Sequence, residues 1–415
     1  MSFFLSGFFA RIAASLQEPG FRVFLFGQAL ALQGTWVQGT AQRWLVLEMT
    51  DSTLLVGVLG AVSGLPILLF ALAGGVMADR LPRISFLIAV QGIIALQALM
   101  FGVLVQTGHI EYWTILLFSF ILGAGISFEV PARQALIYNL VGRDRITNGI
   151  ALHSTAFNLA RFGGPALAGF MIQAGYMAEC FYFKALTSTC VIVCLVYVLH
   201  NYRRYNLPVR QKKESPVSAI LEAVAFARNH PVLSRLLALT ICFGIFLLPY
   251  SMLLAPFGRD ILGLNASGYG LLSASNGLGA LCGAIVVAGS GNVKNRMGWW
   301  WSGTLFFPAS LMVLSVTQSF WQAAVVLFLS GFAMVTVATS ALSFMQKETP
   351  DSLRGRMMGL FSTCFMGLFP LGSLLQGLLG ELIGVRMTLL LAGIVGIGAT
   401  FMVWRSWSRR TVEPL

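Results

Sequence analysis

Long apolar runs that could each cross a lipid bilayer recur along the whole chain, and Leu54–Met77 and Ile84–Val105 are two of them. A helix of about 20 apolar residues spans the hydrocarbon core of a bilayer, and the chain carries about twelve such runs. Only 10% of its 415 residues are charged, whereas a soluble domain carries about 25%. Strands of a transmembrane barrel would be short and would alternate in polarity. The sequence therefore predicts an all-α membrane protein.

The longest polar stretch divides the apolar runs into two sets of six. Residues 1–200 are the predicted N-terminal half, and residues 1–20 within it are an interfacial segment lying on the membrane. Residues 201–230 are a basic cytoplasmic linker with an amphipathic helix over Val217–Arg228. Residues 231–415 are the C-terminal half. Two six-helix halves related as parallel repeats are a known plan of secondary transporters.

Lysine and arginine concentrate in alternate loops. Cytoplasmic loops of membrane proteins are enriched in these residues, so we expect a multi-pass protein of the cell (inner) membrane with both termini in the cytoplasm. The net charge of +12 then reflects topology, and no nucleic-acid partner is expected. The residues assigned to the inner side, besides the linker, include Arg80, Arg83, Arg143, Arg145, Lys294, Arg296, Lys347, Arg354, Arg356, Arg409 and Arg410.

The chain shows no pattern of cofactor or metal chemistry. Its six cysteines lie in or beside apolar runs without metal-ligand spacing, and we interpret them as small buried apolar residues. We expect no cofactor, no metal and no enzymatic activity, because no nucleophile elbow, phosphate-binding loop or paired His/Asp cluster is present. A membrane enzyme or sensor is the interpretation of this chain that we favour least.

The first apolar run, Phe21 to about Leu47, is unusually polar. Amide side chains cannot face lipid without losing hydrogen bonds, so this face should meet protein or water. Hydrogen bonding between helices is one explanation, and a cavity wall is the one we favour, because several amides in a stripe exceed what packing needs. The residues on this face, at heptad spacing, are Gln28, Thr35, Gln38 and Gln42, and Trp36 lies on a neighbouring stripe.

The fourth and fifth runs carry charges inside the membrane. Glu129 and Arg133 lie one turn apart in the fourth run, and Arg161 lies near the middle of the fifth. Such charges cost about 2.5–3.5 kcal/mol each near a helix centre and are normally paired. We predict that Glu129 pairs with Arg161, with Arg133 as the competing partner, and that the pair couples transport to protons. The alternatives are a permanent structural ion pair and Glu129 serving as the partner of Arg83.

The polar stretch Gly74–Arg83 is predicted to be a tight turn between two membrane helices. It resembles motif A of the major facilitator superfamily, in which Gly75, Asp79, Arg80 and Arg83 match, while Pro82 and Ile84 depart from the pattern. The resemblance implies the twelve-helix major facilitator fold and a conformational latch. In that latch Asp79 lies near Arg356–Met358 at the start of the eleventh helix, and Arg83 reaches an acid on the fourth. The alternative is that both residues only set topology.

Four further segments resemble the branch of this superfamily that contains the enterobactin exporter and macrolide efflux proteins. They are Pro131–Leu136, Asn158–Arg161, Gly164–Gly169 and Leu353–Arg356. The cluster Gly163–Pro165 also partly resembles the antiporter motif of the fifth helix. The resemblance implies export of a small organic molecule driven by the proton gradient.

We therefore expect a monomeric secondary transporter in the lipid bilayer that works by alternating access. A largely apolar cavity favours a hydrophobic or amphipathic cargo, because the second-half runs carry almost no internal charge. A lipid or lysophospholipid flippase on the same fold is the alternative. Further cavity candidates, each of which could instead be a packing residue, are Asn158, Tyr250, Ser275, Asn276, Thr336 and Thr339.

Overall fold

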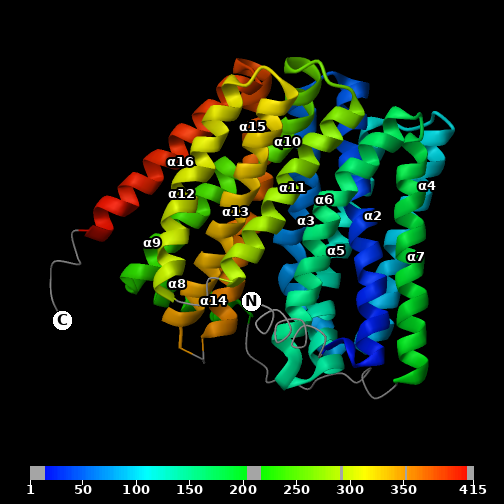
Figure 1. Ribbon diagram of the computed structural model, residues 1–415. Coiled ribbons are helices and arrows are strands. Elements are labelled where there is room, and N and C mark those ends of the chain that lie inside the picture. Colours follow the sequence, from blue (N-terminus) through cyan, green and yellow to red (C-terminus); the bar gives the residue numbers. More distant parts are fainter. Residues whose placement is uncertain (1–14, 203–215, 290–292, 351–352, 409–415) are drawn as a thin grey trace, which may run out of the picture. The chain divides into compact units, whose positions relative to one another are not determined.

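The computed structural model describes residues 15–202, 216–289, 293–350 and 353–408, and these segments contain helices and no strand (Figure 1). Most of the predicted interfacial segment, residues 1–14, and part of the predicted linker, residues 203–215, lie outside the described residues. A helix, α8 (Pro216–Asn229), lies where the amphipathic helix was predicted.

The long helices follow the apolar runs of the sequence. In the first part of the chain they are α2 (Pro19–Thr50), α3 (Thr53–Arg80), α4 (Arg83–Gln106), α5 (Tyr112–Val141), α6 (Ile146–Gln173) and α7 (Met177–Asn201). After α8 they are α9 (Pro231–Cys242), α10 (Tyr250–Pro256), α11 (Ala266–Gly289), α12 (Val293–Val316), α13 (Phe320–Glu348), α14 (Arg354–Ser362), α15 (Phe369–Ile383) and α16 (Val385–Ser408). π-helical turns join α9 to α10 (η3, Phe243–Leu247) and α14 to α15 (η5, Thr363–Gly367), and a third, η4 (Phe257–Ile261), extends α10.

Nine helical segments in the described part of the chain are long and apolar enough to span a bilayer, with α9 to η4 and α14 to α15 each forming one span. The other three long helices, α2, α6 and α12, are too polar for that criterion, α2 because of its amides and arginines. The nine spans and these three helices make twelve, which is consistent with the predicted count.

The helices form two compact units. The first contains residues 1–42 and 69–212, and the second contains residues 43–68 and 213–415. The helices α2 and α3 are therefore divided between the units, α2 after Gln42 and α3 after Leu68.

The first unit is held together by close helix contacts and stacked aromatic rings. Phe101 of α4 and Phe181 of α7 stack with ring centroids 3.9 Å apart, and both are fully buried. A Cβ atom at Gly74 would lie 2.5 Å from the Ser127 carbonyl oxygen, so α3 and α5 meet where only glycine fits. Small residues permit this backbone approach between membrane helices.

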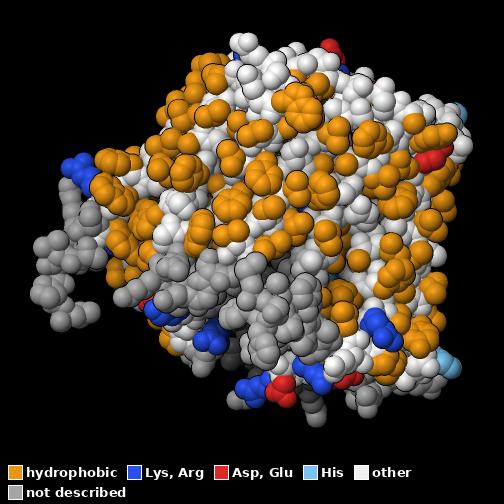
Figure 2. All heavy atoms as spheres, viewed as in Figure 1, with side chains coloured by type: hydrophobic (Ala, Val, Ile, Leu, Met, Phe, Trp, Pro, Cys, Tyr) orange, Lys and Arg blue, Asp and Glu red, His pale blue; other side chains and the backbone are white. Residues whose placement is uncertain are grey.

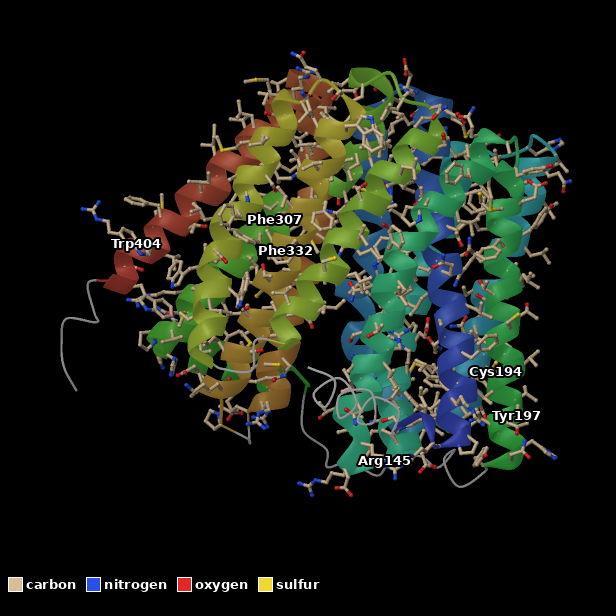
Figure 3. The ribbon with its side chains drawn as sticks, viewed as in Figure 1. Arg145, Cys194, Tyr197, Phe307, Phe332 and Trp404 are labelled. Atoms are coloured by element: carbon tan, nitrogen blue, oxygen red, sulfur yellow. The ribbon has the colours of Figure 1, made fainter. Side chains whose placement is uncertain are left out.

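In the second unit, α11 and α13 pack backbone to backbone. A Cβ atom at Gly279 would lie 1.8 Å from the carbonyl oxygen of Phe328, and one at Gly331 would lie 2.0 Å from that of Asn276. Phe307 of α12 lies among the helices of this unit (Figure 3), where its ring makes edge contacts with those of Phe243 and Tyr250.

The second unit also holds the end of α2 and the beginning of α3. Gly57 of α3 crosses Gly377 of α15 so closely that a Cβ atom on Gly57 would lie 2.6 Å from the Gly377 Cα atom. The two-residue connection between α2 and α3 is bound by two other helices. Arg259 forms an ion pair with Asp51, and Glu381 accepts hydrogen bonds at 3.0 Å from the Ser52 hydroxyl and the Leu54 backbone N–H.

Large apolar side chains are exposed on many helices, as expected for surfaces that lipid covers. On the face shown in Figure 2, hydrophobic side chains predominate, and the visible charged side chains lie mostly near the margins. Trp113 and Trp321, at the beginnings of α5 and α13, are about three-quarters exposed (74% and 76%). Tryptophan is enriched at the membrane–water interface.

The predicted turn at Gly74–Arg83 needs correction. The helix α3 continues to Arg80 and α4 begins at Arg83, so only Leu81 and Pro82 connect them. Helical hydrogen bonding continues through the motif because its one proline comes after Arg80, and a proline restricts the residue before it to extended conformations.

Candidate functional site

The amide face of α2 points into the helix packing of the first unit. Gln28, Gln38 and Gln42 are all at least 95% buried. The Gln38 amide donates to the Gln97 amide oxygen of α4 at 3.5 Å, and the Gln42 amide donates to the Ser119 hydroxyl of α5 at 3.3 Å. Gln38 and Gln42 thus join α2 to α4 and to α5, which is the helix-to-helix alternative. Neither amide atom of Gln28 has a hydrogen-bond partner among the described residues, so the cavity-wall role of this face stays a proposal.

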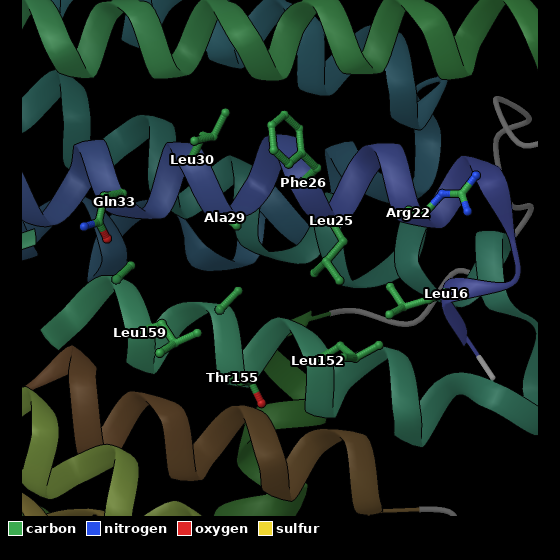
Figure 4. A pocket seen from close by; sticks show the side chains of 12 residues that line it. Leu16, Arg22, Leu25, Phe26, Ala29, Leu30, Gln33, Leu152, Thr155 and Leu159 are labelled. Carbon is green, nitrogen blue, oxygen red and sulfur yellow. The ribbon is translucent and has the colours of Figure 1, made fainter. Parts of the chain in front are cut away.

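Another face of α2 lines an open groove with α6 (Figure 4). The groove has a volume of about 600 Å³ and is lined mostly by apolar side chains. Among them, Phe26 is 63% exposed and Leu159 is 50% exposed. Arg22 lies toward one end of the α2 side and Gln33 at the other. A concave apolar surface with a few polar groups is the usual form of a small-molecule site.

The groove ends where α2 and α6 approach each other. A Cβ atom at Gly163 would lie 2.7 Å from the Gln33 amide nitrogen, and one at Gly164 would lie 2.4 Å from the Cβ atom of Trp36. The Gly/Pro cluster of α6 thus packs against α2 at the Gln33 end of the groove. Trp36 makes an edge contact with Phe157, and the Arg161 guanidinium lies 5.9 Å from the Trp36 ring centroid.

Glu129 pairs with Arg133. The guanidinium Nη1 of Arg133 lies 2.6 Å from the Glu129 carboxylate, and both side chains are about nine-tenths buried. The predicted partner, Arg161, contacts the Trp36 ring instead, and the competing partner holds the carboxylate. The reason is geometric, since residues four apart on one helix are neighbours on its surface.

Lys184 joins this buried charge cluster. Its side chain is only 2% exposed, and Glu129 and Arg133 both act on it electrostatically. The ammonium group donates to the Thr35 hydroxyl at 3.0 Å and to the Ala31 carbonyl at 3.4 Å, so it ties α7 to α2. Figure 1 shows these two helices running side by side.

Several buried polar atoms near α2 have no hydrogen-bond partner among the described residues. Both amide atoms of Gln28 and of Gln91, the Gln38 amide oxygen, the Ser188 hydroxyl and the His153 Nε2 atom belong to this group. Buried polar groups are normally satisfied by protein or by ordered water. The interior of the first unit is therefore polar enough to hold water.

The motif A residues are only partly described. Arg83 is 95% buried, and its guanidinium donates to the Asn139 amide oxygen at 2.8 Å and to the Ala135 carbonyl at 3.3 Å. These two partners on α5 are neutral groups, and the predicted contact of Arg83 with an acid of the fourth helix stays a prediction. Arg80 is exposed, and a Cβ atom on Gly75 would contact nothing within 4 Å. The Asp79 side chain lies outside the described residues, so its contact with Arg356–Met358 stays a prediction.

The candidates of the second unit bond mostly within their own helices. The hydroxyls of Ser275, Thr336 and Thr339 donate to carbonyls three or four residues earlier, and Asn276 donates to the Leu327 carbonyl of α13. Tyr250, Asn276 and Thr336 are at least 94% buried, so they serve packing in this structure. In the first unit, the partly exposed Asn158 donates to the Ser154 carbonyl of its own helix.

Sequence reasoning missed two features of the site. The first is that Phe26 and Gln33 line the groove. The residue type alone does not show whether an apolar or amide side chain on a membrane helix faces a groove, lipid or another helix. The second feature is Lys184, which is buried. A lysine inside an apolar run was the available signal, because intramembrane charges usually face a bundle interior. In the described part of the chain, no group of His, Cys, Asp and Glu could hold a metal ion.

Residues 11–412 match the family model described as transmembrane secretion effector. The chain belongs to this family of the major facilitator superfamily. The transporter is 24% identical to the multidrug efflux pump Tap of Mycolicibacterium fortuitum, over 92% of this chain and 95% of that one. It is 26% identical to the enterobactin exporter EntS of Salmonella typhimurium (88% and 86% covered) and 21% identical to macrolide efflux protein A of Streptococcus pyogenes (88% and 91% covered). The predicted family and branch are confirmed.

Solved structures confirm the fold. A bacterial homologue of the human lysosomal transporter Spinster, solved in an inward-facing and unoccupied conformation, superposes with a TM-score of 0.72. The match covers 96% of this chain and 100% of that one at 14% identity. The all-helical major facilitator fold predicted from the apolar runs is therefore correct.

Proposed function

We propose that the protein exports small hydrophobic or amphipathic molecules from the cell, by alternating access and in exchange for protons. The observation that carries this proposal is the open apolar groove between α2 and α6, in a chain whose relatives bear the names of efflux proteins. A groove with mostly apolar walls would desolvate a sugar or an ion without replacing its hydrogen bonds, at a cost of several kcal/mol per polar group. An apolar cargo avoids that cost.

The polar groups of the groove favour an amphipathic cargo. Arg22 is exposed and Gln33 is half-buried, and neither has a polar partner among the described residues. Eleven residues separate them along α2, which places their Cα atoms about 16 Å apart at the usual rise of an α-helix. A cargo with an anionic or polar end at Arg22 and an apolar body beside Phe26 would use both features. Trp36 and Asn158 are not among the residues that line the groove, and they remain proposed cargo contacts.

Proton coupling is proposed for the buried cluster of Glu129, Arg133 and Lys184. Ionisable residues inside a membrane protein commonly mark proton relays. Arg161 also stays a candidate for proton coupling, because it contacts Trp36. Cargo bound against Trp36 would shift Arg161 and so affect the charged cluster. Both termini are proposed to be cytoplasmic, and the motif A residues Gly75, Asp79, Arg80 and Arg83 to latch the cytoplasmic side.

The proposal is tested in inside-out membrane vesicles of cells that express the protein. Fluorescent hydrophobic and amphipathic dyes are the probes, with an imposed inside-acidic pH gradient or none. Vesicles should accumulate dye when the gradient is present, and a protonophore should abolish accumulation. Gradient-independent equilibration alone would remove proton coupling, and no protein-dependent dye movement would remove the proposed efflux function.

A lipid or lysophospholipid flippase is the second candidate, because the groove is open and carries an arginine at one end. Reconstituted protein should then move a fluorescent lysophospholipid between leaflets faster than protein-free vesicles do. If lysophospholipid moves and the dyes do not, the flippase replaces the efflux function.

Filling the groove should slow transport. Ala29→Trp places a large ring among the groove side chains, so we expect a severalfold slower dye efflux with little loss of stability, because the groove is open. Initial rates in vesicles, normalised to protein amount, measure the effect. Leu96→Trp on the exposed face of α4 is the matched control. Equal slowing in both variants would show that the groove is not used.

Locking the α2–α3 connection should stop transport. Ser52 and Glu381 are hydrogen-bonded in this conformation, and we propose that alternating access separates them. In a variant without the six native cysteines, Ser52→Cys with Glu381→Cys should be bridged by a short thiol cross-linker. Transport should cease on cross-linking and return on reduction. Full transport by the cross-linked protein would show that this contact does not open, and the single-cysteine variants are the controls.

A further inference from the structure

The buried charges of the first unit do not balance. Glu129 is the acid of the cluster, whereas Arg133 and Lys184 are both basic, and all three side chains are at least 88% buried. The other titratable group nearby, His153 of α6, is under the influence of Arg133. An uncompensated charge in a low-dielectric interior is costly. When all three groups are ionised, the cluster therefore carries one more positive charge than negative charge.

The geometry of the ion pair makes it a permanent one. Glu129 and Arg133 are one turn apart on the same helix, with their charged atoms at 2.6 Å. Movements of helices against one another leave this pair intact, since both residues travel with α5. If Glu129 instead took up a proton, Arg133 and Lys184 would remain as two buried positive charges without an acid. Glu129 is thus a poor carrier of the coupling proton.

Lys184 has the features that the pair lacks. It lies on α7 and donates only to neutral groups of α2, the Thr35 hydroxyl and the Ala31 carbonyl. These bonds require an N–H donor and depend on how α2 lies against α7. The helix α2 is also one of the two that are divided between the compact units. Protonation of Lys184 therefore acts on an element that alternating access has to move.

We propose that Lys184 carries the coupling proton and that the Glu129–Arg133 pair serves as its fixed neighbour. Charged Lys184 holds α2 against α7 through Ala31 and Thr35. Neutral Lys184 keeps fewer donors, which weakens its hold on α2. A lysine amine exists with or without its proton, whereas an arginine stays charged. On the same side of α2, both amide atoms of Gln28 and the amide oxygen of Gln38 have no hydrogen-bond partner among the described residues, so they can bind the water that would deliver the proton. This inference rests on the proposed proton-coupled efflux.

The test uses the full-length protein in liposomes with a pH-sensitive dye inside. Lys184→Gln is permanently neutral and can still donate to Thr35, and Lys184→Arg is permanently charged. Both should equilibrate a fluorescent cargo down its gradient but should neither accumulate it against a pH gradient nor move protons with it. A third variant, Glu129→Gln with Arg133→Gln, removes the fixed pair as a neutral unit. It should still move protons with the cargo, at a reduced rate, because Lys184 remains.

The opposite pattern overturns the proposal. Accumulation at the wild-type level by Lys184→Gln or Lys184→Arg would show that Lys184 only packs or only supplies charge. A double variant that equilibrates cargo but moves no protons with it would assign the proton to Glu129. If the wild-type protein itself ignores the pH gradient, the proposed coupling fails, and Lys184 has no proton to carry. Downhill equilibration by each variant shows that it is folded.

Discussion

Glu129→Gln alone is expected to abolish gradient-driven accumulation of cargo while sparing downhill exchange. The substitution leaves Arg133 buried without its carboxylate at 2.6 Å, and the uncompensated guanidinium then opposes a proton on Lys184. Breaking a buried ion pair by removing one partner costs about 3–5 kcal/mol. A glutamine that still accepts a hydrogen bond from Arg133 should lose less, so a lower melting temperature should accompany the loss of coupling. Transport in vesicles with and without a pH gradient measures the first effect.

Glu111→Gln is the matched control, because Glu111 is exposed just before α5 begins and contacts no part of the cluster. It should transport as the wild type does. If Glu129→Gln still accumulates cargo against its gradient when a pH gradient is imposed, the carboxylate has no part in coupling. The pair would then be only structural.

Gly279→Leu is expected to prevent folding of the second unit. Even a Cβ atom at this position would lie 1.8 Å from the Phe328 carbonyl oxygen, which belongs to the backbone of α13 and cannot swing aside. Overpacking a core costs about 1–3 kcal/mol when side chains can adjust, and more when they cannot. We expect the variant to lose its monodisperse peak in size-exclusion chromatography in detergent and to give little protein in the membrane.

Gly398→Leu on α16 makes the same chemical change where a Cβ atom meets nothing within 4 Å. This control should express and melt as the wild type does. A stable, monodisperse Gly279→Leu protein would show that α11 and α13 can separate without loss of the fold. The close crossing would then be incidental.

The helices could be predicted from the sequence because apolar length alone determines which segments cross a bilayer. Apolar runs do not show how far a helix continues into polar sequence. Pro19 begins α2 two residues before the first apolar run, and its missing N–H costs no hydrogen bond there. Motif A was expected to be a turn, and most of it is the last part of α3.

The roles of the site residues were harder to predict, because each role depends on which neighbour a helix face meets. Heptad spacing correctly placed Gln28, Gln38 and Gln42 together, but a periodic pattern does not distinguish a protein neighbour from a cavity. Glu129 pairs with Arg133, the competing partner, and not with Arg161, the preferred one. Arg133 lies one turn away on the same helix, whereas Arg161 lies on another helix. Lys184 shows the same limit, since its depth in the span was visible and its direction toward α2 was not.

The division of α2 and α3 between the two units has a consequence for how the protein is made. These helices leave the ribosome well before α11 and α15, yet Trp44 stacks on Tyr269 of α11, and Gly57 crosses Gly377 of α15. Until those helices enter the membrane, the end of α2 and the beginning of α3 lack their native neighbours and must be covered by lipid or by the insertion machinery. A nascent chain that ended in the linker would keep these surfaces uncovered. The helices α2 and α3 therefore complete their packing only after α11 and α15 have been inserted.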